Sequence, residues 1–222
     1  MSRTVRIQSD SETLQADLYG ELPATRAVVL VHGQGWDADG WSEFAPRFVA
    51  SGIPALALNL RGHDGSSGTR VAMGKLVDGK WRSEPHPPVE SWSPITDVAA
   101  ATALLREQGA TEVALVGASL GGHAVLGSGS SADVECVVSI SAPVQAMPDE
   151  PIRRIAGRKL FVCASEDRAM PHVLRTFEVA RAPKTLVVFG GTEHARGMFA
   201  APYGAEAIDA IVTFVARGLG PR

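Results

Sequence analysis

The chain has 222 residues and a formal net charge of -3 at pH 7, with 45% of its residues hydrophobic and 20% charged. This composition is typical of a soluble globular protein, and it argues against a surface that binds nucleic acid. The N-terminal residues lack a signal-peptide core and no apolar run is long enough to span a bilayer, so we expect a cytoplasmic protein without a membrane partner. The length fits a single domain over residues 1–222.

Eight short runs of strand-forming residues are spread along the chain, and the first two lie close enough together to predict an antiparallel hairpin. The later runs are continuous stretches of Val, Ala and Leu without polar alternation, which is typical of parallel strands buried on both faces. The runs cover residues 4–8, 14–19, 27–31, 53–59, 112–116, 134–140, 159–164 and 185–189.

Stretches with helical spacing of apolar residues fall between these strands from residue 27 onward. They cover residues 41–51, 94–108, 120–128, 172–182 and 204–218. Strands that alternate with helices predict an α/β fold with a doubly wound, mostly parallel sheet of eight strands. Asp97, near the start of the second helix, is interpreted as a helix cap.

Residues 69–93 do not fit this alternation, because the stretch is too long for an ordinary connection and is rich in Gly and Pro. We call it the excursion. Its Asp78-Gly79 dipeptide favours a turn and predicts a short hairpin around residues 77–81. Two interpretations remain open: a surface segment whose Trp81 and Trp92 are packed for stability, or a segment that lines a substrate cleft.

The most informative motif is Gly117-Ala118-Ser119-Leu120-Gly121-Gly122, which joins a predicted strand to a predicted helix. A serine on such a sharp turn projects its hydroxyl into open space, and the flanking glycines let the backbone pack closely around it. Ser119 is therefore the candidate nucleophile. The alternative is an ordinary N-cap of the helix, because serine is a favoured cap residue.

Other polar residues directly follow strands of the predicted sheet. Gln34 follows the third strand, Asp167 follows the seventh, and His194 follows the eighth. The carboxyl ends of parallel strands meet at one edge of a sheet, where sites form in open α/β folds. We therefore expect a backbone donor, a nucleophile, an acid and an imidazole to meet at this edge.

The chain order Ser119, Asp167, His194 resembles that of the α/β-hydrolase superfamily, and the likeness extends from residue 27 to the C-terminal helix. Pro171, four positions after Asp167, and the glycine pair shortly before His194 are placed as in that family. The segment Arg61-Gly62-His63-Asp64-Gly65-Ser66 is similar to the family's loop after the fourth strand, with an aspartate where glycine is usual.

The resemblance implies a role for each candidate. Ser119 would attack a substrate carbonyl, His194 would accept the serine proton, and Asp167 would orient the imidazole. The backbone N–H groups of Leu120 and Gln34 would form the oxyanion hole. The resemblance implies no cofactor and no metal.

Some of these assignments have competitors. Glu166 is an alternative acid beside Asp167. Trp36, Trp81 and Trp92 are candidates for contacting the substrate, or alternatively for anchoring the core. The histidines other than His194 show no metal-ligand spacing, and we expect them in loop packing (His32, His63), on the nucleophile's own helix (His123) or facing solvent (His86, His172).

Within the superfamily, the chain most closely resembles small, cap-free esterases, including the dienelactone-hydrolase-like group. Residues 140–159 are too few for a large cap domain, so we expect an open site. Because that group often uses a cysteine nucleophile, Ser119 favours ordinary ester hydrolysis. The resemblance implies a serine esterase that cleaves a small or medium carboxylic ester through an acyl-serine intermediate. Its partner would be a small-molecule ester, and the protein would be a monomer or homodimer.

Two alternative functions remain. An acyltransferase would form the same acyl-enzyme and pass the acyl group to an alcohol or amine instead of water. A ligand-binding or sensing protein would keep the α/β-hydrolase fold with little turnover. The presence of all three residue types at the expected positions favours an enzyme.

Overall fold

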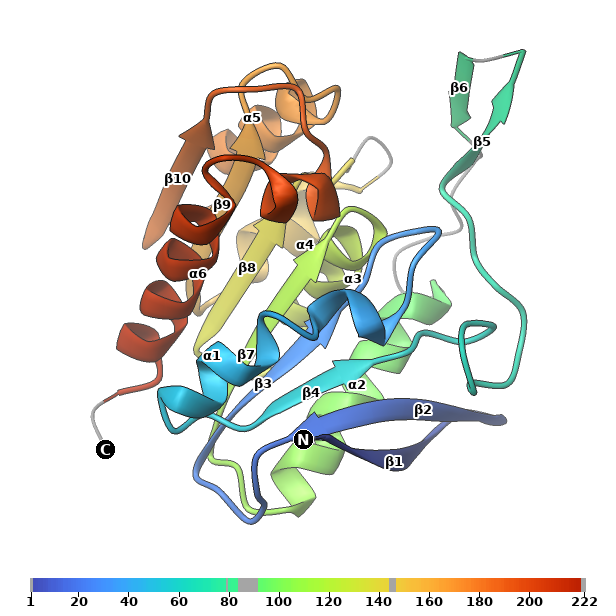
Figure 1. Cartoon of the computed structure of the whole chain (residues 1–222), viewed down its shortest axis with the longest axis vertical. Helices are drawn as coiled ribbons and strands as arrows, with labels where there is room; N and C mark the ends of the chain where they lie inside the picture. Colours follow the sequence, from blue (N-terminus) through green and yellow to red (C-terminus); the bar gives the residue numbers. More distant parts are fainter. Residues whose placement is uncertain (1, 79, 84–91, 144–146, 221–222) are drawn as a thin grey trace.

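The computed structural model describes residues 2–78, 80–83, 92–143 and 147–220, with the backbone alone at residues 76, 81 and 83. Its main sheet contains β1 (Ser2–Ser9), β2 (Glu12–Tyr19), β3 (Arg26–Val31), β4 (Ala55–Leu58), β7 (Glu112–Ala118), β8 (Cys136–Ile140), β9 (Arg158–Ala164) and β10 (Lys184–Phe189). These eight strands lie in the order β1-β2-β4-β3-β7-β8-β9-β10 (Figure 1). All eight predicted strands are confirmed.

The sheet is mixed at one edge and parallel elsewhere. β1 and β2 pair as the predicted antiparallel hairpin, and β2 pairs antiparallel with β4. From β4 to β10 every neighbouring pair is parallel. The chain adds β4 on one side of β3 and β7 on the other, so the strand order reverses at β3. In open α/β sheets, ligands bind beyond the carboxyl ends of the strands at such a reversal.

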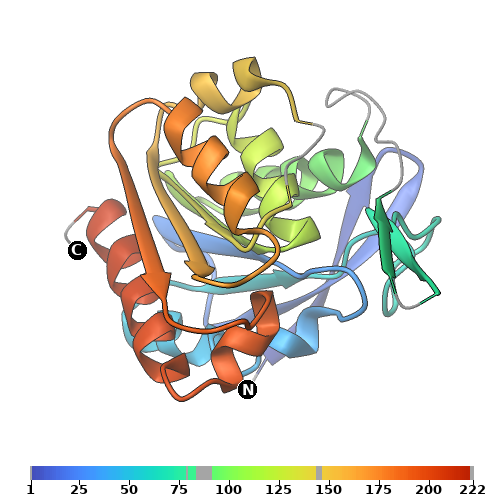
Figure 2. The same ribbon diagram turned by 90° about the horizontal axis from the view of Figure 1, so that it is seen from above.

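Helices cover both faces of the sheet, as Figure 2 shows from above. On one face pack α2 (Ser93–Glu107), α3 (Leu120–Gly129), α4 (Asp149–Arg154) and α5 (Met170–Val179). On the other face lie α1 (Ala45–Ala50), α6 (Gly204–Gly218) and two 3-10 segments, η1 (Ala38–Trp41) and η3 (Ala195–Ala200). No helix within the described ranges is both long and apolar enough to cross a membrane.

Strand β3 shows why the central runs are continuously apolar. All six of its residues are buried. Val29 and Val31 belong to the core beneath α2 to α5, whereas Val28 and Leu30 belong to the core beneath α1 and α6. Successive side chains of a strand point to opposite faces, so the middle of a strand that is covered on both faces favours apolar side chains, and the charged Arg26 stands at the strand's first position.

Two observed helices differ from the predicted ones at their ends. The stretch 41–51 is divided into η1 and α1, with Pro46 in the first turn of α1. Proline lacks the N–H that an α-helix needs beyond its first turn, so one α-helix cannot run through this position from Trp41. The stretch 172–182 forms α5, which begins earlier, with Pro171 in its first turn, and ends at Val179 because Ala180 is extended.

The excursion contains the predicted hairpin. β5 (Gly74–Val77) pairs antiparallel with β6 (Lys80–Ser83), and Asp78 in the turn has a left-handed backbone with φ of +50°. Figure 1 shows this hairpin projecting from the body of the molecule, on the side toward which the parallel strands point. The remainder of the excursion, residues 79 and 84–91, lies outside the described ranges.

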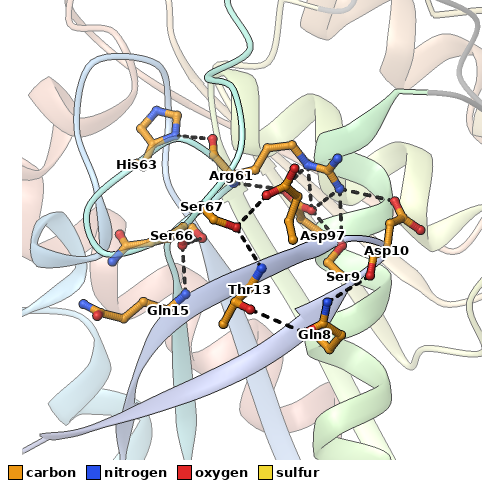
Figure 3. A network of polar contacts seen from close by, with 12 residues as sticks. Gln8, Ser9, Asp10, Thr13, Gln15, Arg61, His63, Ser66, Ser67 and Asp97 are labelled. Atoms are coloured by element: carbon orange, nitrogen blue, oxygen red, sulfur yellow. Dashed lines mark hydrogen bonds and ion pairs between the residues drawn. The ribbon is translucent and has the colours of Figure 1, made fainter.

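The interpretation of Asp97 as a helix cap is wrong. Asp97 lies in the second turn of α2 and its side chain is fully buried. Its carboxylate accepts hydrogen bonds from the Arg61 backbone N–H (3.0 Å), the Arg61 guanidinium (2.6 Å to Nη2) and the Ser9 hydroxyl (2.8 Å), as Figure 3 shows. The Arg61–Asp97 pair therefore ties α2 to the end of β1 and to the loop after β4, which leads into the excursion.

We predict that Asp97→Ala destabilises the protein by about 3 kcal/mol, because the mostly buried Arg61 would lose its buried partner and keep only its longer pair with the exposed Asp10 (3.4 Å). Asp209→Ala is the matched control. Asp209 also pairs with an arginine, Arg47, but both side chains are at least half exposed, so its loss should cost less than about 1 kcal/mol. Urea unfolding measures both costs, and equal costs would contradict the role given to the buried pair.

Candidate active site

Ser119 occupies a strained turn between β7 and α3, in the left-handed region with φ of +54°. The neighbouring glycines have no room for side chains: a Cβ at Gly117 would lie 2.2 Å from the Gly121 carbonyl oxygen. A Cβ at Gly121 would in turn lie 2.2 Å from the Val31 carbonyl oxygen. The Ser119 side chain makes no helix-capping hydrogen bond, so the packing of the turn leaves the hydroxyl for other contacts.

Three strand ends bring Ser119, His194 and Asp167 into one hydrogen-bonded chain. The Ser119 Oγ lies 2.9 Å from His194 Nε2. On the far side of the ring, His194 Nδ1 lies 2.9 Å and 3.0 Å from the two Asp167 carboxylate oxygens. The carboxylate can only accept, so Nδ1 carries the proton and Nε2 is left as the acceptor for the serine hydroxyl.

Asp167 is almost fully buried after β9, and its carboxylate is well supplied with donors. The Ala169 backbone N–H donates to Oδ1 (2.9 Å), and the Cys163 thiol lies 3.6 Å from Oδ2. Burial by itself would raise the pKa of Asp167, but the hydrogen bonds from His194 and Ala169 lower it below its usual value. The alternative acid, Glu166, is exposed, and in the described part of the chain the His194 ring bonds to Asp167 and Ser119 rather than to Glu166.

Ser141 links the histidine loop to the sheet, a contact that sequence reasoning missed. It follows β8 with a left-handed φ of +50°, and its hydroxyl accepts the backbone N–H of Ala195 at 3.1 Å. The same hydroxyl lies 3.9 Å from the Cys163 sulfur. Burial raises the pKa of Cys163 to about 12, so this residue remains a neutral thiol beside the Asp167 carboxylate. The position of Ser141 directly after a buried strand is the feature of the sequence that could have indicated a residue near the site.

The loop after β3 approaches the Ser119 turn closely. A Cβ at Gly33 would lie 3.1 Å from the Ser119 Cβ, so residues 33 and 34 are neighbours of the nucleophile candidate. The backbone N–H groups of Gln34 and Leu120 make no hydrogen bond within the described ranges. Both are therefore available for an oxygen atom bound beside Ser119.

His32 braces this loop from behind. Its ring is fully buried, and burial lowers its pKa to about 3, so the ring is neutral. Nδ1 donates to the Gly33 carbonyl (2.9 Å) and Nε2 accepts the Leu60 backbone N–H (3.1 Å). The ring thus joins the loops after β3 and β4, which agrees with the loop packing expected for His32.

A cleft of about 310 Å³ opens beside Ser119 and His194. In the described part of the chain its wall contains apolar and uncharged polar residues and one arginine, and no carboxylate: Gln34, Gly35, Met73, Ser119, Pro143, Arg168, Ala169, His172 and His194. Met73 belongs to the excursion, which therefore borders the cleft.

The expectation that His172 faces solvent is wrong, because its ring is half-buried in the cleft wall. Burial and the neighbouring Arg175 lower the pKa of His172. Arg168 lies in the turn before α5 and His172 lies in the first turn of α5, and both line the cleft. The other histidine expected in solvent, His86, lies outside the described ranges.

Two of the three tryptophans proposed as substrate contacts are packed away from the cleft. Trp36 lies against Trp41, with ring centroids 5.3 Å apart, and backs the Gly33 turn. Trp92 is 2% exposed and lies beside His123. The side chain of Trp81 lies outside the described part of the structure. Trp92 is therefore packed as a core anchor, whereas Trp36 is partly buried against the core.

Metal ligands are not clustered in the part of the chain that the structure describes. No three His, Cys, Asp or Glu side chains there form a group that could hold a metal ion. The two cysteines, Cys136 and Cys163, are free and buried.

Comparisons with known proteins agree on the fold. Residues 28–159 match the model of the alpha/beta hydrolase family. An esterase from Pyrococcus furiosus has a TM-score of 0.77 at 17% identity, covering 99% of this chain and 94% of its own. A monoacylglycerol lipase from Paleococcus ferrophilus has a TM-score of 0.72 at 19% identity, covering 92% and 99%. A dienelactone hydrolase from Anabaena variabilis has a TM-score of 0.70 at 18% identity, covering 98% and 96%. No curated protein matches the chain.

We predict that Gly117→Ala destabilises the protein by about 1–3 kcal/mol and lowers the reactivity of Ser119, because the added methyl group would force the turn open. Gly190→Ala is the matched control, since a Cβ there meets no atom within 4 Å and should change stability by less than about 0.5 kcal/mol. Urea unfolding gives both values. A Gly117→Ala variant as stable as Gly190→Ala would show that the turn is not closely packed.

Proposed function

The chain belongs to the alpha/beta hydrolase family, and on this basis we propose that it is a serine esterase that cleaves a small or medium carboxylic ester through an acyl-Ser119 intermediate. One observation carries the proposal: a single chain of hydrogen bonds runs from the Ser119 hydroxyl through His194 to the buried Asp167 carboxylate. A serine hydroxyl is a weak nucleophile at neutral pH and needs such a base to take its proton.

In the first half-reaction, Ser119 Oγ attacks the ester carbonyl carbon while His194 Nε2 takes the hydroxyl proton. Asp167 holds the ring in this tautomer and stabilises the imidazolium that forms. When the tetrahedral intermediate collapses, the bond to the alcohol oxygen breaks and His194 gives its proton to the departing alcohol. Water then attacks the acyl-Ser119 ester by the same route, which releases the carboxylic acid and restores the serine.

The negative charge of the tetrahedral intermediate needs donors beside Ser119. The backbone N–H groups of Leu120 and Gln34 are the proposed donors, because both are unused in the described part of the chain and flank the nucleophile. Loss of one such donor typically costs on the order of 3 kcal/mol of transition-state stabilisation.

The cleft supports a substrate of small or medium size. Its volume of about 310 Å³ is at the lower end of the range for ligand pockets. The connection from β8 to β9 contains only the six-residue helix α4 among its described residues, which favours an open site without a large cap. The structural neighbours include an esterase and a lipase, which is consistent with an ester as the substrate.

We predict that Ser119→Ala and His194→Ala each lower kcat/KM for a short-chain p-nitrophenyl ester by about a thousandfold or more. The double variant should lose little more than either single one, because the two residues act as a unit. Asp167→Asn should cost about a hundredfold or more, since it disturbs the histidine tautomer. Glu166→Gln, the matched control, should leave the rate unchanged.

Fluorophosphonate labelling with mass spectrometry of the modified peptide tests the same proposal without a chosen substrate. Label on Ser119 in the wild-type protein, absent in Ser119→Ala, is the expected result. The absence of both label and turnover would contradict an esterase and would favour a ligand-binding protein. Product analysis with competing alcohols separates hydrolysis from acyl transfer, since a transferase would form the new ester in preference to the free acid.

A further inference from the structure

The side chain of Gln34 joins the loop after β3 to the excursion. Its Nε2 donates to the Gly74 carbonyl and its Oε1 accepts the Met73 backbone N–H, both at 2.9 Å. The carboxamide thus pairs with a backbone donor and a neighbouring backbone acceptor at the start of β5. We call this pair of hydrogen bonds the Gln34 clasp.

The clasp is a polar attachment of the hairpin to the body. It joins Met73 and Gly74, at the start of β5, to the loop after β3. Figure 1 shows that the β5–β6 hairpin stands away from the sheet and its helices. Met73, at the base of the hairpin, is 4% exposed and also lines the cleft. The clasp therefore fixes the segment that forms this part of the cleft wall.

The loop residues on either side of Gln34 differ in how firmly they are held. A Cβ at Gly33 would lie 2.6 Å from the Trp36 ring nitrogen, so this side of the loop is closely packed. At Gly35 the φ is +88° and a Cβ would meet no atom within 4 Å, so packing does not hold that side. The peptide that carries the Gln34 N–H is held on the Gly33 side by His32 Nδ1, which donates to the Gly33 carbonyl, and the Gln34 side chain restrains the same residue toward Gly35.

We propose that the Gln34 side chain is a positioning residue: the clasp to Met73 and Gly74 aims the Gln34 backbone N–H at the oxygen bound beside Ser119. This inference rests on the proposed function, which gives that N–H its role as an oxyanion donor. It goes beyond that function because it gives the Gln34 carboxamide, and the base of the excursion that it binds, a role in positioning the oxyanion donor. The clasp acts on the transition state, in which the oxyanion is present, more than on binding of the neutral ester.

The test uses Gln34→Met, which keeps the length of the side chain and removes both hydrogen bonds. For a short-chain p-nitrophenyl ester we expect kcat to fall by about tenfold to a hundredfold, the effect of a misplaced group near the reacting atoms, with KM changed by less than about twofold. The matched control is Gln108→Met. Gln108 is exposed between α2 and the start of β7, at the end of the sheet opposite the cleft, so this variant should match the wild type.

Hydrogen exchange at the Met73 amide provides a readout that does not depend on activity. This amide donates to Gln34 Oε1, so its protection should be lost in Gln34→Met and kept in Gln108→Met. Gln34→Leu also removes both hydrogen bonds and adds no charge beside the oxyanion, so its kcat should fall to a similar extent. If Gln34→Met does not fold, Gln34→Leu carries the same comparison.

The outcomes separate this inference from the function beneath it. If the wild type turns over the ester and the kcat of Gln34→Met is within about twofold of the wild-type kcat, the inference about the clasp is overturned and the proposed function is not. A clasp that positions the donor must affect the transition state and therefore kcat. A rise in KM of about tenfold to a hundredfold without a fall in kcat would also overturn the inference, because that pattern indicates a loss of substrate binding. Absence of both turnover and Ser119 labelling in the wild type would overturn the proposed function, and this inference with it.

Discussion

The candidate site depends on the close approach of two backbone segments, the turn at Ser119 and the loop after β3. A Cβ at Gly121 would collide with the carbonyl groups of Val31 and His32, and a Cβ at Gly33 would press on Ser119 itself. Glycine is therefore required at both contacts. The left-handed backbone of Ser119 persists because buried β7 and fully buried α3 hold the turn from either side. This packing places the hydroxyl at the reversal in strand order, where the cleft opens.

Buried polar groups extend this constraint to the rest of the site. Ser141 binds the peptide that follows His194, and the neutral Cys163 thiol lies against the Asp167 carboxylate. On the opposite side of the cleft, neutral His32 joins two neighbouring loops, and Gln34 joins one of them to the excursion. Each contact fastens a loop to a neighbouring strand or loop. The groups that would react are thus oriented by the sheet through short links, as precise positioning requires.

The family, the strand and helix order and the residues now found together at Ser119 could be predicted because their signals are local. A buried strand, a glycine-rich turn and a helix are each encoded within about ten residues. The assignments that failed concern residues whose partners are distant in the chain. Asp97 was interpreted from its place near a helix start, whereas its partner Arg61 is 36 positions away. His172 is expected in solvent from the sequence, and only the packing of α5 places it in the cleft wall.

The amino-acid sequence by itself determined the alternation of elements, the tight turn at Ser119 and the residue types at the ends of the strands, because periodicity and turn chemistry act over short distances. The tertiary structure alone decided that Asp167 rather than Glu166 meets His194, that Trp36 and Trp92 pack away from the cleft, and that the Gln34 carboxamide binds the excursion. Such contacts depend on the order and register of strands that are far apart in the chain, and no local pattern encodes that order or the side-chain directions that follow from it.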